Sequence, residues 1–377
     1  MPRVLHLGPL HSFHLHRWAE IAREAGYEPH LGGLALRGME AVDFGDVAAS
    51  VHTAPGVRPP LGTAARLVWL RRVMRAVEPD VVHAHHLPSW GALATLARCR
   101  PLVVSVWGSD VYFGQGSGRA ASAAIRRADR LLAPSPHMLR ELIQAGADPD
   151  RCEHVEWGVD LDRFAPAAAD GARARAELGL GEGPVVFSFR GAYPAYNLET
   201  AIEAFGLLRG RAPDAQLLVA HARSPLAPEA RQALDRLRSE GAAVTVVGDV
   251  PPERMPACYQ AATVGVSIPS SDGSPRSVWE GLACGLPMVL SDLPQIRERV
   301  EGNPAVRLVP IEAPAVAEAL AELLRPDPSL AATSREWAAR NVDYREHVAR
   351  LRQVYESVST ERTGRRSEAA SALPRSS

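Results

Sequence analysis

Short apolar runs alternate with longer amphipathic segments along most of this chain of 377 residues. The apolar runs occupy residues 4–7, 81–83, 102–106, 131–133, 185–189, 217–220, 244–247, 264–268 and 288–290. Runs of this length between turn signals are typical of strands buried on both faces. Their alternation with amphipathic segments predicts an α/β fold, in which parallel sheets carry helices on both faces.

The length of the chain predicts two domains, because one hydrophobic core rarely organises so many residues. The polar, Ala-rich segment 166–182 interrupts the series, and a second round begins after it. We predict two doubly wound, Rossmann-like domains facing a cleft, over residues 1–165 and 166–357, with ligands at the carboxyl ends of the strands. Residues 358–377 are Ser, Arg, Glu and Ala without periodicity, so we expect a disordered tail.

Composition narrows the classes of function. The formal net charge of −1 argues against a nucleic-acid partner, which usually requires a strongly basic face. No run approaches the ~20 apolar residues that span a bilayer, and the N-terminus lacks a signal-peptide pattern. We therefore expect a cytoplasmic protein with reduced thiols, since its cysteines lack metal or redox spacing. These are Cys99, Cys152, Cys258 and Cys284.

Two carboxylates, Asp272 and Glu280, lie eight positions apart after the apolar run 264–268. Asp272 falls in a loop rich in Gly, Ser and Pro, and Glu280 falls in the first turn of a short helix that ends at Gly285. Unpaired backbone N–H groups at a helix start attract anions, so segment 274–278 suits a diphosphate. A carboxylate on each side then accepts hydrogen bonds from hydroxyls of a nucleotide-sugar.

The segment from Asp272 to Met288 resembles the signature of the family 4 retaining glycosyltransferases. That pattern is Glu, seven residues, Glu, then Ala-Met-Ala-x-Gly-x-Pro-Val. Here Asp272 is followed by seven residues, Glu280 and Gly-Leu-Ala-Cys-Gly-Leu-Pro-Met. The resemblance implies the two-domain GT-B fold, with Asp272 on the sugar and Glu280 on the ribose. The first acid is one methylene shorter than the family's, which bears on sugar choice rather than on the nucleotide.

Further segments resemble the family in the family's order: a strand ending at Gly8, then 79–85, 101–110 and 157–164. Helical spacing after Gly8 predicts a helix that stops at Gly26. The resemblance covers nearly the whole chain.

The phosphate-binding segment departs from the family. Arg190 follows a strand as expected, but Tyr196 and Asn197 stand where the family usually has a Lys. Arg276 and Arg223 are candidates to supply the missing positive charge by bidentate contact with phosphate. The candidate donor-binding residues are Gly8, Arg190, Ser274, Arg276, Ser277, Val278 and Glu280.

The first domain lacks a family landmark, because Trp107 occupies a position where members often have a His. Asp110 on the same loop and His85 at a neighbouring strand end remain candidates to orient the acceptor hydroxyl. For a single His, a hydrogen-bonded structural role is the alternative interpretation. Family members line the acceptor side with the segment corresponding to 11–16. The candidate catalytic residues are Asp110, His85 and Asp272.

We expect neither a metal nor a cofactor besides the donor. Asp160 and Asp162 have the spacing of a manganese motif from another glycosyltransferase architecture, but they lie in the interdomain segment beside apolar residues. Segment 64–77 is a basic amphipathic helix that suits peripheral contact with the inner face of a membrane, and an ordinary surface helix is the alternative.

These residues predict metal-free transfer of a sugar from a nucleotide-diphosphate-sugar to a hydroxyl of a sugar, lipid or small-molecule acceptor, with retention implied by the resemblance. Two alternatives stay open: a nucleotide-sugar epimerase of similar fold, which needs no acceptor, and a non-catalytic binding protein.

Overall fold

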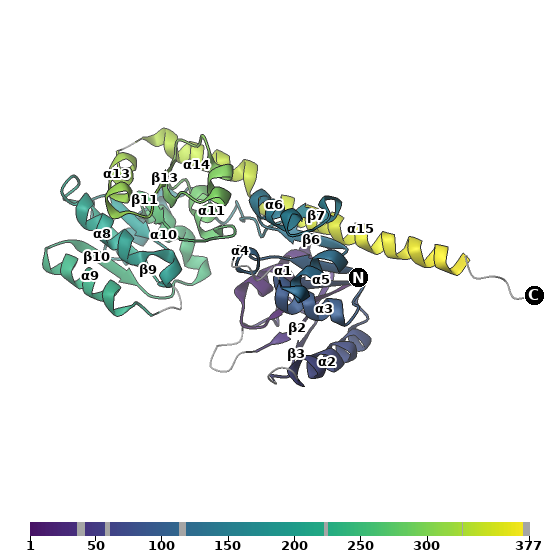
Figure 1. Cartoon of the computed structure of the whole chain (residues 1–377). Coiled ribbons are helices and arrows are strands. Elements are labelled where there is room, and N and C mark those ends of the chain that lie inside the picture. Colours follow the sequence, from purple (N-terminus) through teal and green to yellow (C-terminus); the bar gives the residue numbers. More distant parts are fainter. Residues whose placement is uncertain (36–41, 57–60, 113–117, 222–224, 326, 372–377) are drawn as a thin grey trace, which may run out of the picture. The chain divides into compact units, whose positions relative to one another are not determined.

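The computed structural model describes residues 1–35, 42–56, 61–112, 118–221, 225–325 and 327–371. The chain divides into two compact units, one of residues 1–157 with 345–377 and one of residues 158–344 (Figure 1). Each unit contains one parallel sheet with helices. The predicted α/β fold of two Rossmann-like domains is confirmed.

Unit 1 is built on a seven-stranded parallel sheet of order β3-β2-β1-β4-β5-β6-β7. Its strands are β1 (Arg3–Pro9), β2 (Glu28–Leu34), β3 (Ser50–Thr53), β4 (Val81–His85), β5 (Leu102–Ser105), β6 (Arg130–Ala133) and β7 (Cys152–His154). The central strands β1 and β4 pair in parallel, with His6 opposite His83. Their carboxyl ends therefore lie together at one edge of the sheet.

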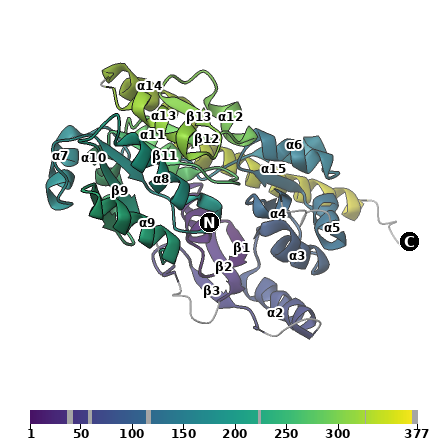
Figure 2. The ribbon, with the colours of Figure 1, turned by 60° about the vertical axis from the view of Figure 1, so that its left-hand side comes forward.

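The helices of unit 1 begin and end where local signals predict. In α1 (Phe13–Glu24) the Ser12 hydroxyl accepts a hydrogen bond from the His14 N–H, and Gly26 follows with a φ of +92°. The basic segment forms α2 (Leu61–Val77), which packs against β2 (Figure 2). The others are a π-helical turn (His86–Gly91), α3 (Ala92–Leu96), α4 (Ser109–Tyr112), α5 (Arg119–Arg127), α6 (Pro136–Gln144) and a 3-10 turn (Pro149–Arg151).

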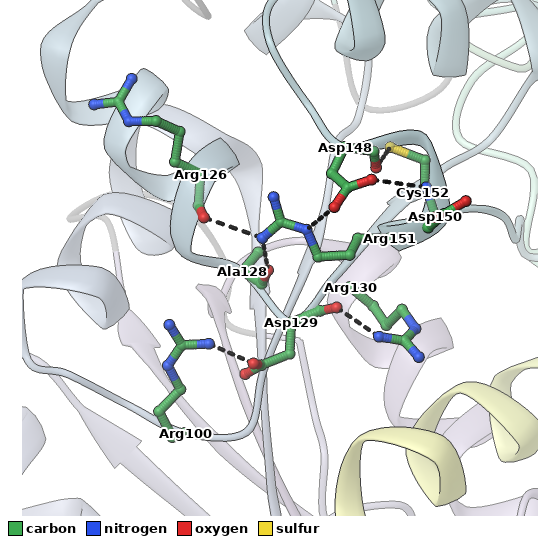
Figure 3. Close-up of polar contacts among 9 residues, drawn as sticks. All are labelled: Arg100, Arg126, Ala128, Asp129, Arg130, Asp148, Asp150, Arg151 and Cys152. Atoms are coloured by element: carbon green, nitrogen blue, oxygen red, sulfur yellow. Dashed lines mark hydrogen bonds and ion pairs between the residues drawn. The ribbon is translucent and has the colours of Figure 1, made fainter. Parts of the chain in front are cut away.

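Polar contacts fix the opposite edge of this sheet, where β5, β6 and β7 begin (Figure 3). The Arg151 guanidinium donates to the carbonyls of Arg126 and Ala128 at 3.0 and 2.9 Å. The Asp129 carboxylate pairs with Arg100 and accepts the Leu102 N–H at 2.7 Å. These contacts satisfy backbone groups at the strand starts, away from the carboxyl edge.

The last helix, α15 (Tyr344–Ser371), belongs with unit 1 from Arg345 onward. The Arg352 guanidinium donates to the carbonyls of Ala25 and Glu24 at 2.9 and 3.1 Å. Four apolar side chains at helical spacing are buried: Val348, Leu351, Tyr355 and Val358. This periodicity explains why residues 345–357 pack with unit 1 instead of continuing the predicted second domain. Helix α15 runs on to Ser371 where we expected a disordered tail, and residues 372–377 lie outside the described part.

Unit 2 contains a six-stranded parallel sheet of order β10-β9-β8-β11-β12-β13. Its strands are β8 (Val185–Ser188), β9 (Gln216–Ala220), β10 (Ala243–Val247), β11 (Val264–Ser267), β12 (Met288–Ser291) and β13 (Val306–Val309). One face packs against α8 (Leu198–Leu208), α9 (Pro228–Ser239) and α13 (Ala313–Leu323). The other packs against α10 (Met255–Ala261), α11 (Arg276–Ala283), α12 (Pro294–Val300) and α14 (Pro328–Asn341). Helix α7 (Ala168–Glu177) packs on α10.

Two features of the sequence signature position α11. A Cβ at Gly281 would come within 2.0 Å of Met288 Cε on β12, so glycine lets α11 lie close to β12 without a shift of the Met288 side chain. Gly285 ends the helix region with a φ of +82°, as its place after the helix predicts. The helix start is thereby held at the carboxyl edge of the sheet. Among the described residues, no helix combines the length and hydropathy needed to cross a membrane.

Candidate functional site

The loop that carries Asp272, residues 269–275, follows β11 and is tied down from three directions. The Asn197 amide donates to the Ile268 carbonyl at 2.8 Å and to the Ser270 hydroxyl at 3.0 Å. The Gln295 amide donates to the Asp272 carbonyl, and the Ser291 hydroxyl donates to the Pro269 carbonyl at 2.7 Å. The side chain of Asp272 is therefore presented by a braced loop.

Asp272 pairs with Arg190, which follows β8. An oxygen of Asp272 lies 2.6 Å from the Arg190 guanidinium, and the two side chains are 10% and 11% exposed. The guanidinium also donates to the Ser277 hydroxyl at 3.2 Å and lies 4.2 Å from the centre of the Tyr196 ring. Burial alone would lower the pKa of Arg190, but Asp272 and then Tyr196 outweigh it, so the pKa of Arg190 is raised.

The second acid, Glu280, pairs with Arg276 one helical turn earlier, at 3.0 Å. Its charge also reaches the buried Tyr259 hydroxyl: burial first, and Glu280 second, raise the pKa of Tyr259 well above 10.0. Each predicted carboxylate thus has an arginine partner. The structure brings Asp272, Glu280, Arg190 and Arg276 to the carboxyl edge of β8 and β11 as two ion pairs.

The predicted backbone cradle differs from the expectation of unpaired N–H groups. The Val278 N–H donates to the Pro275 carbonyl at 2.8 Å, and the Arg276 N–H donates to the Ser274 carbonyl at 2.9 Å. Pro275 at the N-cap has no side-chain acceptor, so the chain satisfies these donors with its own tight turn. The Ser274 hydroxyl accepts from the Trp279 indole at 2.9 Å, and the Val278 side chain is buried.

In unit 1, packing explains the glycine at position 8. A Cβ there would lie 2.9 Å from Leu15, and a Cβ on the paired Gly33 would lie 1.7 Å from the Gly8 carbonyl oxygen. Close approach of β1 and β2 therefore requires glycine at position 33, whereas a Cβ at position 8 would displace the Leu15 side chain.

The Asp110 carboxylate is fully buried and accepts three backbone N–H groups, those of Trp107, Gly108 and Leu87, each at 2.9 Å. The carboxylate thereby fastens the loop after β5 to the turn after β4.

His85 is fully buried together with His6 and His83. Its pKa is lowered well below 6.5 by burial and then by His83 and His6, so the imidazole is neutral. The His83 ring bonds to the Tyr355 hydroxyl at 2.7 Å and to the Ser105 hydroxyl at 2.6 Å. This chain of contacts anchors α15 to the sheet.

Nitrogens of the three histidines lie within 4.8 Å of one another, which is the spacing of a metal site. The His6 Nδ1 and His85 Nε2 atoms, however, already share a hydrogen bond at 2.9 Å. A metal there would force protons onto the opposite nitrogens, His6 Nε2 and His85 Nδ1, which have no acceptor among the described residues. Metal-binding histidines normally donate that second N–H to a partner. The cluster is therefore poorly suited to a metal.

The manganese-like spacing of Asp160 and Asp162 has a structural explanation. Asp160 accepts the N–H groups of Asp162 and Arg163 at 3.1 and 3.2 Å, which closes a turn. Arg223, the other candidate phosphate ligand, lies outside the described residues.

Family models match both halves of the chain. Residues 12–163 match the model described as Glycosyltransferase Family 4, and residues 184–326 match Glycosyl transferases group 1. A GDP-mannose-dependent alpha-(1-6)-phosphatidylinositol monomannoside mannosyltransferase of Mycolicibacterium smegmatis is 31% identical over 70% of this chain and 72% of its own length. The chain belongs to glycosyltransferase family 4.

A second curated relative and two solved structures are also similar to this chain. A D-inositol 3-phosphate glycosyltransferase of Salinispora arenicola is 34% identical over 73% of this chain and 68% of its own length. Sucrose-phosphate synthase from Thermosynechococcus elongatus superposes with a TM-score of 0.79 at 17% identity, covering 96% of this chain and 100% of that one. The structure of Anabaena HepE in complex with UDP superposes with a TM-score of 0.78 at 19% identity, and the match covers 95% of this chain and 100% of that one. The protein is thus a nucleotide-sugar-dependent glycosyltransferase with the GT-B fold.

Several contacts of this glycosyltransferase were not foreseen. Tyr196 stacks on Arg190, and Asn197 braces the loop from a left-handed conformation with a φ of 50°. Asn is the non-glycine residue that most readily adopts this conformation, so the Tyr-Asn pair in place of a Lys was an available signal. No feature of the sequence predicts the hydrogen bond from the Gln295 amide to the Asp272 carbonyl.

Proposed function

We propose that unit 2 of this glycosyltransferase binds a nucleotide-diphosphate-sugar at the carboxyl ends of β8 and β11. Arg190 binds the diphosphate with help from Arg276 and Ser277, Glu280 accepts the ribose hydroxyls and Asp272 accepts a sugar hydroxyl. The observation that carries the proposal is the buried, permanently charged Arg190, held by Asp272, Ser277 and Tyr196.

The donor's negative charge would compete with Asp272 for Arg190. A guanidinium has five N–H donors, so it can hold phosphate oxygens in bidentate geometry once that contact loosens. Asp272 then becomes an acceptor for the sugar. During transfer the bond between C1 and the diphosphate oxygen breaks, the acceptor oxygen bonds to C1, and the acceptor proton leaves on the diphosphate. Arg190 stabilises the charge that develops on the departing group.

Calorimetry with nucleoside diphosphates tests this assignment. Arg190→Ala should weaken binding by the ~1.5–3 kcal/mol of a lost charged hydrogen bond, which is roughly 10- to 150-fold. Arg173→Ala is the matched control, because Arg173 lies on α7 with its side chain 70% exposed. Equal affinities for the two variants would remove Arg190 from the donor site. Thermal shift with GDP-mannose and UDP-glucose identifies the donor, since a ligand of the folded state raises the melting temperature.

Metal independence and retention are parts of the same proposal. The arginine charges at the site support transfer without a divalent cation, and retention is what the family resemblance implies. Activity should therefore persist in excess chelator, and NMR of the early product should give the anomeric configuration of the donor. Activity lost to chelator and restored by manganese would overturn the first point.

The finer nature of the acceptor is also proposed. The named relatives act on phosphatidylinositol monomannoside and D-inositol 3-phosphate, so a hydroxyl of a lipid-linked or free polyol is our proposed acceptor. Helix α2 supports peripheral membrane contact, because Arg71, Arg72 and Arg75 are exposed beside exposed Leu61 and Val68. Co-sedimentation with anionic vesicles, lost in an Arg71→Glu/Arg72→Glu variant, is the expected outcome. Donor consumption without any acceptor would instead indicate an epimerase.

A further inference from the structure

A cavity of about 260 Å³ lies in unit 1 where α3 ends and β5 begins, beside the last residue of α5. It opens at the edge of the sheet shown in Figure 3, opposite the carboxyl ends of the strands. Six residues line it: Thr95, Arg98, Cys99, Arg100, Leu102 and Arg127. The cavity therefore contains none of the residues that we assign to donor binding or transfer.

Three of the six lining residues are arginines, and none of the six is acidic. The Arg100 guanidinium pairs with Asp129 (Figure 3). In the part of the chain that the structure describes, the guanidinium groups of Arg98 and Arg127 have neither an ion-pair nor a hydrogen-bond partner. A guanidinium is always charged and offers five N–H donors, so two uncompensated charges with open donors face this cavity.

Negative groups near the cavity do not cancel these charges. Helices α3 and α5 both end there, and each contributes about half a negative charge. The carbonyls of Arg126 and Ala128 at the end of α5 already accept the Arg151 guanidinium. Burial raises the pKa of the Cys99 thiol to about 12, so the thiol stays neutral. Three guanidinium charges exceed the charge of Asp129 and the two helix ends together, and the cavity is positive.

A buried hydroxyl also lines the cavity. Thr95 is 4% exposed, and within the described ranges its Oγ1 atom has no hydrogen-bond partner. Nearly all buried polar groups in folded proteins are paired, so an occupant that brings oxygen atoms suits this lining. Ligand pockets for whole small molecules usually measure about 300–1,000 Å³, so this smaller cavity fits a compact group rather than a nucleotide. Planar guanidinium groups match the oxygens of phosphate in bidentate geometry.

We propose that this cavity is a binding site for a phosphate dianion, either free phosphate or the phosphate of a small monoester. Arg98 and Arg127 supply the open charge, Arg100 adds a third guanidinium and Thr95 adds a hydroxyl. The lining residues carry this proposal without any appeal to the transfer reaction. An occupant that binds only the folded state also stabilises unit 1.

Calorimetry on the full chain tests the site with two probes, inorganic phosphate and glycerol 3-phosphate, and sodium chloride at equal ionic strength is the control. We expect saturable binding of a phosphate probe and none of chloride. Binding of inorganic phosphate alone identifies the free ion as the ligand, and binding of glycerol 3-phosphate identifies a monoester. No saturable binding of either probe would overturn the proposal.

Variants locate the binding. Arg98→Gln/Arg127→Gln should weaken it by about tenfold or more, because two charged hydrogen-bond donors are lost. Arg119→Gln is the matched control, since Arg119 is exposed on the same helix α5 and does not line the cavity. Equal weakening in both variants would reduce the effect to general surface charge and refute the site. Thr95→Val should also weaken binding, yet without phosphate it should not lower the melting temperature, because no hydrogen bond is lost.

One further titration separates this cavity from the proposed donor site, where inorganic phosphate can also bind. Arg190→Ala should keep the affinity of the cavity, and Arg98→Gln/Arg127→Gln should keep both nucleoside diphosphate binding and transfer activity. Phosphate binding lost in Arg190→Ala and kept in Arg98→Gln/Arg127→Gln would sink the cavity while the proposed function stands. Phosphate binding lost only in the latter supports the cavity whatever the donor titrations give.

Discussion

Replacement of Asp272 by Asn should destabilise unit 2 by about 3 kcal/mol. Two unit charges about 4 Å apart attract by about 4 kcal/mol at an effective dielectric constant near 20. Removal of one partner from a buried pair typically costs about 3–5 kcal/mol, because the remaining charge is left uncompensated. Both side chains are about one-tenth exposed, so screening by water is limited. An Asn oxygen still accepts one hydrogen bond from Arg190, which places the loss at the lower end.

The assay is thermal unfolding of the chain labelled with 5-fluorotryptophan, followed by fluorine NMR at the signal of Trp279, which lies on α11. A loss of about 3 kcal/mol should lower the melting temperature by roughly 6–12 °C in a unit of this size. Asp170→Asn is the matched control, since its partner Arg173 is exposed and such surface pairs contribute little.

A double-mutant cycle tests whether Asp272 and Arg190 interact through their charges. In the Asp272→Asn/Arg190→Met variant no charge is left unpaired, so the two losses should fall short of additivity by about 2 kcal/mol. Losses that add to within about 0.5 kcal/mol would refute the claim that Asp272 holds Arg190 by charge.

Three further predictions follow from the same structure. Glu280→Gln should weaken nucleoside diphosphate binding by about 1.5–3 kcal/mol in calorimetry, because an amide accepts ribose hydroxyls less strongly than a carboxylate, and unchanged affinity would exclude Glu280. Burial lowers the pKa of His6 from 6.5 to about 3, so below pH 6.5 the unfolded chain binds a proton that the folded state does not. His6 should then contribute a fall of about 1.4 kcal/mol per pH unit to the free energy of unfolding of unit 1, and melting curves from pH 7 to 4 should be flatter for His6→Asn. Tyr355→Phe should cost about 1–3 kcal/mol, because it leaves a buried His83 nitrogen without its partner, whereas Ser357→Ala on the same helix should be nearly neutral in the same melts.

The sequence predicts the fold where strands are apolar and fails where they are not. All nine apolar runs that we list overlap strands of the two sheets, such as β1, β4 and β11. Strand β2 (Glu28–Leu34) contains Pro, His and two Gly, yet its five central residues are buried. Tertiary packing on both faces stabilises this segment as a strand, and the sequence shows no periodicity that would predict it.

The candidate site is likewise only partly predictable from the sequence. The spacing of Asp272 and Glu280, and the position of Arg190 after a strand, are local features that the sequence displays. The pairing of Arg190 with Asp272 joins residues 82 positions apart, and the contact of His83 with Tyr355 joins residues 272 apart. Such contacts depend on strand order, which the pattern of apolar runs does not encode.

The return of α15 to unit 1 makes unit 2 an insertion within the chain of its neighbour. The two ends of unit 2 meet, since Val159 and Asp343 form a parallel bridge and the Tyr344 N–H donates to the Val159 carbonyl at 3.0 Å. During synthesis unit 2 therefore has all of its residues before unit 1 has its last helix. Until Tyr355 leaves the ribosome, the imidazole of His83 lacks its hydrogen bond to the Tyr355 hydroxyl. The β-sheet of unit 1 also lacks the helix α15. Unit 1 can therefore complete its packing only after every residue of unit 2 has been synthesised.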